Sequence, residues 1–185
     1  LSVASGQGYL TVTPLQLANM MAAVANGGTL YRPRVVDKIE SVDGTVVREY
    51  GPEKIRTISL KPATWERLHK GLADVVNGVG GTGGAARSKI VEIAGKTGTA
   101  QIVEMKGAYL KSEQLAYFNR DHAWFVSYAP AQNPRIALAI LVEHGGHGGE
   151  AAAPLAKKVI EKYMELQTQP SGQRQVRIEG ETRAD

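Results

Sequence analysis

Cysteine is absent from this sequence of 185 residues, which excludes disulfide bonds and metal sites built on thiolates. Aromatic residues are scarce at 6%, and the 22 basic and 18 acidic residues are scattered along the chain. Nucleic-acid binding is therefore disfavoured, because it typically needs a basic stripe interleaved with aromatic side chains. The longest uninterrupted apolar run, Ile136–Val142, is far shorter than the roughly 20 residues with which a helix spans a bilayer. We therefore expect no membrane-spanning segment and no signal peptide in these residues.

Hydrophobic residues make up 43% of the chain, which is enough to supply the core of one globular domain. The sequence starts at Leu1 rather than at methionine and enters a patterned segment almost at once. We therefore expect it to be a piece of a longer polypeptide.

Two segments carry helix signals. In the first, Thr13 is the predicted N-cap, Gln16 completes a capping box and Gly27 ends the helix. Its apolar and small residues lie nearly all round, so we expect burial between other elements. The second helix, over residues 61–78, places large apolar residues on one face and His69 on the solvated face. These apolar residues are Trp65, Leu68, Leu72, Val75 and Val76.

Two further segments are predicted to be a hairpin region and a loop. Residues 31–60 contain short β-branched runs joined by Asp43-Gly44, a strong hairpin turn signal, and indicate a small β meander. Residues 78–84 hold five glycines in seven positions, which predicts a loop. A phosphate cradle is less favoured there, because no helix start follows the glycines directly.

Three strand candidates follow, at residues 89–103, 122–130 and 135–144. The last two are predicted antiparallel neighbours, and the third is apolar enough to be covered on both faces. A closing helix over residues 150–167 carries large apolar residues that we assign to the core, namely Leu155, Val159, Ile160, Tyr163 and Leu166. The predicted fold class is α/β, of the α+β kind, with an antiparallel sheet flanked by helices. Residues 168–185 are polar and are predicted to be a disordered tail.

The stretch "IAGKTGTAQIV" in the first strand candidate is the main candidate for chemistry. A phosphate loop would need a glycine where Ile90 stands and a helix beginning at Thr97, and the sequence offers neither. As a strand, the stretch instead projects Thr97 and Thr99 to one face and Lys96 and Gly98 to the other.

Two neighbouring hydroxyl donors suit a carboxylate, and the ammonium of Lys96 can stabilise a nearby anion. Gly98 weakens a strand, which is consistent with something approaching the backbone closely at that position. The alternative for Thr97 and Thr99 is an ordinary structural role, since β-branched residues favour strands.

The motif "KTGTAQ" resembles the third motif of the penicillin-binding proteins and serine β-lactamases. The segments "GQGYLTVTPLQLANMMAAVANGGTLYRPRVV", "HAWFVSYAPAQNPRIALAILVE" and "AAAPLAKKVIEKY" extend the resemblance in the same order. Together they are similar to the C-terminal part of a class B penicillin-binding protein transpeptidase domain, which would cover residues 1–167. "GQGYLTVTPLQLAN" favours the elongation type, penicillin-binding protein 2, over the division type.

The resemblance implies a role for each residue of the motif. Lys96 would lie beside the proton network of a catalytic serine. The hydroxyls of Thr97 and Thr99 would bind the terminal carboxylate of the acyl donor or that of a β-lactam. The backbone N–H of Thr99 would form one arm of the oxyanion hole, and Gly98 would allow close approach of the substrate.

The other two motifs of the family are missing from this sequence. None of the eight serines is followed three residues later by lysine, so the chain has no nucleophile motif. Ser41-Val42-Asp43 matches the second motif formally, but the predicted Asp43-Gly44 turn explains it. A covalent acyl-enzyme needs a nucleophile with its base, so we expect the parent protein to be a peptidoglycan D,D-transpeptidase and the isolated chain to be inactive.

Other consequences follow from the resemblance. The partners would be peptidoglycan stem peptides, β-lactams and other cell-wall elongation proteins, on the outer side of the cytoplasmic membrane and with an anchor upstream of Leu1. Without the upstream half, we expect some self-association of this fragment through exposed apolar surface. No cofactor is expected.

Two alternatives stay open. A non-catalytic peptide-binding or cell-wall-binding module could use the same strand without a nucleophile. His144 and His147 have a His-x-x-His spacing, but they lie on a glycine-rich loop in an order that differs from the zinc-peptidase motifs, so no metal site is predicted.

Overall fold

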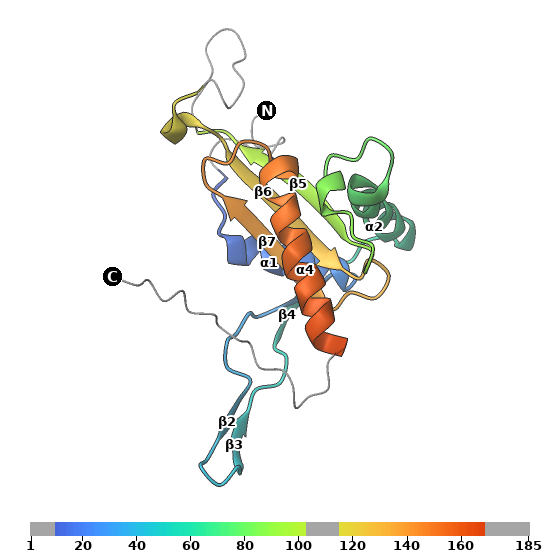
Figure 1. The fold of residues 1–185 in the computed structure, drawn as a ribbon. Helices are drawn as coiled ribbons and strands as arrows, with labels where there is room; N and C mark the ends of the chain where they lie inside the picture. Colours follow the sequence, from blue (N-terminus) through green and yellow to red (C-terminus); the bar gives the residue numbers. More distant parts are fainter. Residues whose placement is uncertain (1–9, 103–114, 169–185) are drawn as a thin grey trace, which may run out of the picture.

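The computed structural model describes residues 10–102 and 115–168. Its centre is an antiparallel sheet in the order β5-β6-β7, formed by β5 (Ala94–Ala100), β6 (His122–Ala129) and β7 (Ile136–Val142) (Figure 1). The predicted tail beyond Thr168, and Val103 at the end of the motif stretch, lie outside the described residues.

Helices cover both faces of this sheet (Figure 1). Helix α4 (Ala153–Thr168), preceded by the single turn α3 (Gly148–Ala151), crosses one face. Helix α1 (Pro14–Ala25) lies against the other face, and α2 (Pro62–Asn77) runs beside β5. The predicted arrangement of an antiparallel sheet flanked by helices is confirmed.

The register of the strands explains the two layers of the core. Side chains alternate along each strand, so Phe125 and Ala123 face α4 while Tyr128 and Ala94 face the opposite side. On the first side they pack with the fully buried Ile160 of α4. On the second side they pack with residues of α1 and α2, among them Met21 and Leu72.

Four short strands form an arm that projects from the sheet (Figure 1). β1 (Thr29–Tyr31) pairs with β4 (Lys54–Thr57) at its base, and β2 (Lys38–Glu40) pairs with β3 (Val46–Glu49) at its tip. The predicted turn is present, because Gly44 adopts a positive φ of 85° and Asp43 Oδ1 accepts the Thr45 N–H at 3.1 Å. The turn thus accounts for the formal second-motif match of Ser41-Val42-Asp43.

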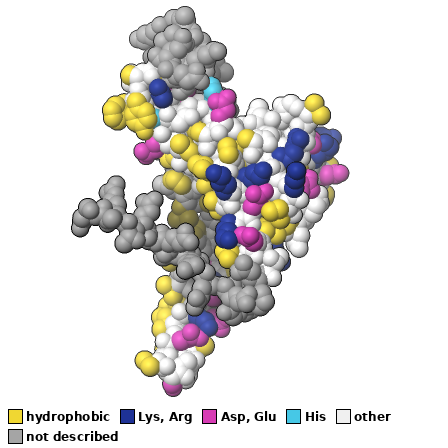
Figure 2. Space-filling view, in the orientation of Figure 1, with side chains coloured by type: hydrophobic (Ala, Val, Ile, Leu, Met, Phe, Trp, Pro, Cys, Tyr) yellow, Lys and Arg dark blue, Asp and Glu magenta, His cyan; other side chains and the backbone are white. Residues whose placement is uncertain are grey.

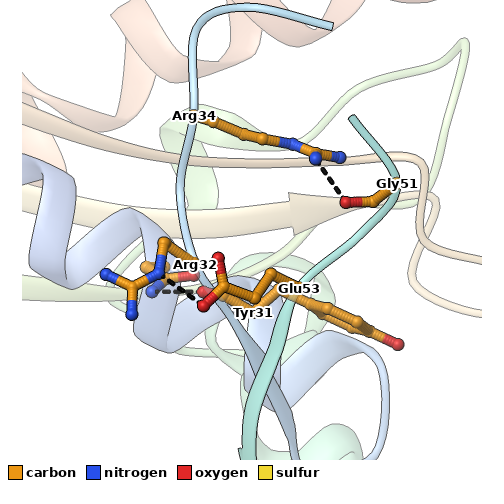
Figure 3. A network of polar contacts seen from close by, with 6 residues as sticks. Tyr31, Arg32, Arg34, Gly51 and Glu53 are labelled. Atoms are coloured by element: carbon orange, nitrogen blue, oxygen red, sulfur yellow. Dashed lines mark hydrogen bonds and ion pairs between the residues drawn. The ribbon is translucent and has the colours of Figure 1, made fainter. Parts of the chain in front are cut away.

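Polar contacts tie the base of the arm to α1 (Figure 3). The side chain of Arg32 contacts Glu53 at 2.8 Å, and the guanidinium of Arg34 donates to the carbonyl of Gly51. The amide of Asn19 on α1 donates to the carbonyl of Tyr31 at 3.1 Å. The arm is therefore hydrogen-bonded both within itself and to the helix behind the sheet.

The first strand begins later than predicted, at Ala94 instead of residue 89. Residues 89–93 precede β5, and Ile90 is 67% exposed. Val91 and Ile93 are buried, but the backbone carbonyls of residues 92 and 93 accept hydrogen bonds from outside the β5–β6 ladder. The carbonyl of Ile93 accepts from the side chain of Asn77, and the carbonyl of Glu92 accepts from the N–H of Ala131. Alternating burial thus occurs here without a paired strand.

The assignment of the closing helix to the core is correct for Ile160 and wrong for Leu155 and Val159. These two side chains are 43% and 47% exposed, whereas the alanines at 152, 153 and 156 are fully buried. Small side chains allow α4 to lie close to the sheet, so its buried face is the alanine face.

The expected burial of α1 on all sides is also wrong. Met21 and Ala23 are buried, whereas Leu15 is 62% exposed and Met20 is 44% exposed. Its predicted start is confirmed, because Thr13 and Gln16 form the capping box through reciprocal bonds of 3.2 and 2.8 Å.

His69 does not lie on a solvated face as expected. Its Nε2 atom is 2.8 Å from the carbonyl of Val24 on α1, and its ring lies near the rings of Trp65 and Tyr128. His69 therefore links α2 to α1 instead of facing solvent.

The face that carries α4 shows basic and acidic side chains interspersed (Figure 2). Lys162 pairs with Glu165 at 2.7 Å, and Lys157 lies 4.0 Å from Glu161. Each such exposed pair contributes little, roughly 0.2 to 0.5 kcal/mol. Among the helices that the structure describes, none is long and apolar enough to cross a membrane.

Tyr128 gives the fold a predicted dependence on alkaline pH. The side chain is 1% exposed, and its hydroxyl has no hydrogen-bond partner among the described residues. Burial, followed by the charge of Glu92, raises the pKa of Tyr128 above its ordinary value. A raised pKa means that the folded state holds the proton more tightly, so this contribution to stability is complete below pH ~10 and is lost as the pH rises further.

We expect Tyr128→Phe to be neutral or to stabilise the fold by up to about 1 kcal/mol, because it removes an unpaired buried hydroxyl. It should also reduce the loss of stability that we expect of the wild-type chain as the pH rises from about 9 through about 11, most of it above pH ~10. Urea unfolding of both chains across this range measures the effect. Identical pH dependence of the two chains would contradict it.

Candidate active site

The motif lies on β5, which forms one edge of the described sheet. Residues Lys96 to Thr99 pair in register with β6, from Val126 opposite Lys96 to Ala123 opposite Thr99. Lys96 is exposed, and the three residues after it are half-buried. An edge strand with partly accessible side chains can receive an extended ligand beside it.

Thr97 and Thr99 line one pocket of about 530 Å³, as the strand pattern predicts. The other walls are the glycine-rich loop, including Thr82, and the loop and first turn of α3, from His147 to Glu150. Thr97 Oγ1 lies 2.9 Å from Thr82 Oγ1, which is a hydrogen bond in which either hydroxyl can donate. Three residues with hydroxyl groups therefore border this pocket, and the hydroxyls of Thr82 and Thr97 are bonded to each other. Hydroxyls of this kind can donate to an oxygen-rich anion, as proposed below for Thr97 and Thr99.

Lys96 lies on the other side of the strand. It lines a separate hollow of about 600 Å³ with the C-terminal part of α2, including Asp74, and with residues 78–82. Its ammonium donates to the carbonyl of Thr97 at 2.8 Å. The structure thus brings Thr97 and Thr99 together and places Lys96 next to them on the opposite face, with Gly81 and Thr82 bordering both hollows.

Gly98 is closely packed against its neighbours in the fold. A Cβ atom there would lie 3.2 Å from Cβ of Trp124 on the neighbouring strand. Gly148 of α3 packs against the backbone of Gly98. A Cβ atom added to Gly148 would lie 2.5 Å from the carbonyl oxygen of Gly98. The sequence predicts that something approaches the backbone of Gly98 closely, and within the fold Gly148 does so.

Sequence reasoning missed Thr82 and Gly148 as site residues. Both lie in glycine-rich stretches that the sequence predicts to be loops, and the hydrogen bond between Thr82 and Thr97 spans 15 residues of sequence. The one sequence signal that could have pointed to Thr82 and Gly148 is the high density of glycine around them. Glycine permits close contact between backbones, so such stretches can pack directly on a site.

The His-x-x-His spacing does not bring its two histidines to one site. The backbone N–H of His144, which has a positive φ of 55°, donates to Nδ1 of His122 at 2.9 Å, and the His144 ring packs near Tyr117. His147 instead lines the pocket of Thr97 and Thr99. Within residues 10–102 and 115–168, no three acidic, histidine or cysteine side chains are grouped to hold a metal ion.

Comparison with known proteins assigns the family. A family model described as the penicillin binding protein transpeptidase domain matches residues 1–161, and the chain belongs to this family. Peptidoglycan D,D-transpeptidase MrdA of Haemophilus influenzae is 39% identical over 173 residues, which cover 89% of this chain and 25% of that protein. The chain thus spans about a quarter of the length of this curated relative.

Solved structures agree with this assignment. A crystal structure of Pseudomonas aeruginosa PBP2 in complex with WCK 5153 is 40% identical, with a TM-score of 0.65 over 85% of this chain and 32% of the other. A ceftriaxone acyl-enzyme complex of penicillin-binding protein A from Mycobacterium tuberculosis is 29% identical, with a TM-score of 0.70 over 86% and 34%. A complex of PBP2 with MreC from Helicobacter pylori is 29% identical, with a TM-score of 0.67 over 90% and 27%.

The resemblance to the transpeptidase part of a penicillin-binding protein of the PBP2 type is confirmed by these matches. The predicted fold class is confirmed as well, because the similar structures include penicillin-binding proteins and a D,D-transpeptidase domain.

Proposed function

We propose that the polypeptide containing this chain is a peptidoglycan D,D-transpeptidase that crosslinks cell-wall peptides through an acyl-serine intermediate and is acylated by penicillin. The observation that carries the proposal is that two threonines, Thr97 and Thr99, line one pocket at the edge of the sheet. In a chain of this family, such a pair suits the carboxylate that the acyl donor and the β-lactam share.

Each residue of the motif then has a distinct role. An extended stem peptide lies beside β5 as an added strand, with its terminal carboxylate at Thr97 and Thr99. Gly98 has no side chain that would obstruct the peptide. The N–H of Thr99 stabilises the developing oxyanion, which typically contributes a few kcal/mol to the transition state. The ammonium of Lys96 supports proton transfer at the serine and raises the local potential.

The serine and its base come from outside this sequence, because the chain contains no Ser-x-x-Lys. We therefore propose that the isolated chain supplies one wall of the site and performs no acyl transfer. A module that binds cell-wall peptides without covalent chemistry is the alternative, and it would use the same strand.

Fluorescent penicillin tests the proposal. The full-length protein should take up one covalent label per molecule, while the isolated chain should take up none. If the full-length protein takes up no covalent label, the proposed transpeptidase activity is wrong and the binding module is favoured. A stoichiometric label on the isolated chain would show instead that the nucleophile lies within these residues.

The proposed partners follow from the same relatives. The M. tuberculosis protein forms an acyl-enzyme with ceftriaxone, and the H. pylori protein forms a complex with MreC. We propose β-lactams, stem peptides and cell-wall elongation proteins as partners here, on the outer side of the cytoplasmic membrane. Self-association of the isolated chain also stays a prediction, supported by exposed apolar residues such as Leu15 on α1 and Val159 on α4.

A further inference from the structure

Thr82 lies outside β5, and its side chain has a hydrogen bond to the motif. Its Oγ1 lies 2.9 Å from Oγ1 of Thr97. It comes from the glycine-rich loop after α2, and it borders both the hollow of Lys96 and the pocket of Thr97 and Thr99. Neither the motif nor the family match assigns it a role.

The backbone on either side of Thr82 is held against α2 and the sheet. The N–H of Gly83 donates to the carbonyl of Val75 at 2.8 Å. A Cβ on Gly81 would lie 2.4 Å from that same carbonyl oxygen, and a Cβ on Gly83 would lie 3.1 Å from the ring of Phe125. The two glycines therefore let the loop pack directly on its neighbours.

The first turn of α3 packs on the other side of this residue. A Cβ on Gly149 would lie 2.3 Å from the carbonyl oxygen of Thr82, so the backbones of α3 and the loop are in direct contact. The backbone of Thr82 is thus placed by packing against α2 and α3 before any ligand arrives, while the residue itself is exposed at the pocket. Such preorganised positions lose little conformational freedom when a ligand binds.

The hydrogen-bonding capacity of a hydroxyl defines what Thr82 can do. Each hydroxyl has one proton to donate and two lone pairs to accept with. If Thr97 donates its proton to a carboxylate, it must act as acceptor toward Thr82, and Thr82 must then be the donor. Hydrogen bonds in such a chain polarise one another, so the donation strengthens the bond to the anion.

We propose that Thr82 is a positioning residue that holds the Thr97 hydroxyl with its proton directed at the substrate carboxylate. This proposal rests on the proposed function, since it deepens the role given there to Thr97. Thr82 does not touch the substrate in this arrangement and acts through Thr97 alone.

The test measures the second-order rate of acylation of the full-length protein by a fluorescent penicillin. Thr82→Val keeps the shape and removes the hydroxyl, and it should slow acylation about five- to tenfold, the loss expected for one hydrogen bond near a charged group. Thr82→Ser keeps the hydroxyl and should stay within about twofold of wild type. Thr82→Ala provides a second variant without the hydroxyl, and thermal unfolding checks that each variant is folded.

Two further readouts separate positioning from a structural role. In the double variant Thr82→Val with Thr97→Val, the rate should equal that of Thr97→Val alone, because Thr82 acts only through Thr97. With a penicillin whose carboxylate is esterified, Thr82→Val should react as fast as wild type.

Several outcomes would overturn the proposal. These are a wild-type rate in both Thr82→Val and Thr82→Ala, a loss that adds to that of Thr97→Val, or an equal loss with the esterified penicillin. If the wild-type protein is labelled and Thr97→Val is slow while Thr82→Val is not, only the role of Thr82 fails. If the wild-type protein takes no label at all, the proposed function fails with it.

Discussion

Replacing Gly148 with alanine is expected to lower the free energy of unfolding by about 3 kcal/mol, the upper end of the range for overpacking. The added Cβ would lie 2.0 Å from the carbonyl oxygen of Trp124, 2.5 Å from that of Gly98 and 3.0 Å from the Gly98 nitrogen. All three atoms belong to the backbone, so no side chain can turn aside to relieve the clash. The first turn of α3 must move away from the sheet instead.

Gly71→Ala is the matched control. Nothing lies within 4 Å of a Cβ placed at Gly71, which is in the interior of α2. This substitution should stabilise the chain by about 0.5 to 1 kcal/mol, because alanine favours the helix and restricts the unfolded chain. Urea unfolding measures both variants. A Gly148→Ala chain within 0.5 kcal/mol of wild type would show that α3 does not pack on β5 and β6 as described.

Removing the charge of Lys96 is expected to slow penicillin acylation of the full-length protein by about 100-fold or more, the range seen when one preorganised electrostatic group is lost. The side chain is exposed on the face of β5 opposite Thr97 and Thr99, and its hollow shares Gly81 and Thr82 with their pocket. Its ammonium can therefore act on an anion or a proton at this edge of the sheet. Lys96→Ala should leave stability within about 0.5 kcal/mol of wild type, because the side chain is on the surface. We therefore expect the rate of acylation to fall while the free energy of unfolding stays nearly unchanged.

Two variants serve as controls for Lys96. Lys96→Arg keeps the charge and should recover part of the rate, although its planar group cannot occupy the same position as an ammonium. Lys38→Ala removes an exposed lysine from strand β2 of the projecting arm and should leave acylation unchanged. If Lys96→Ala is acylated at the wild-type rate, Lys96 has no part in the chemistry.

The sequence predicted the elements whose signals are local. The capping box of Thr13, the Asp43-Gly44 turn and the alternation of Lys96, Thr97 and Thr99 along the strand all depend on neighbours a few residues away. These three features can therefore be predicted from the spacing of residues along the sequence.

The features that the sequence did not reveal depend on packing between distant segments. Leu155 and Val159 have the spacing of a core stripe, yet the face of α4 that approaches the sheet is the alanine face. His69 has the position of a surface residue, yet the carbonyl of Val24 lies 2.8 Å away. Thr82 reaches Thr97 only because the glycines around it allow the loop to lie against α2 and α3. None of these contacts follows from helical or strand periodicity.

The central claim is that Thr97 and Thr99 form the carboxylate-binding wall of a transpeptidase site. The most direct test is a crystal structure of the full-length protein acylated by a penicillin. We predict that the carboxylate of the bound penicillin lies within about 3.2 Å of the hydroxyls of Thr97 and Thr99, alongside β5. A penicillin whose carboxylate is bound elsewhere, with both hydroxyls out of hydrogen-bond reach, would contradict the claim.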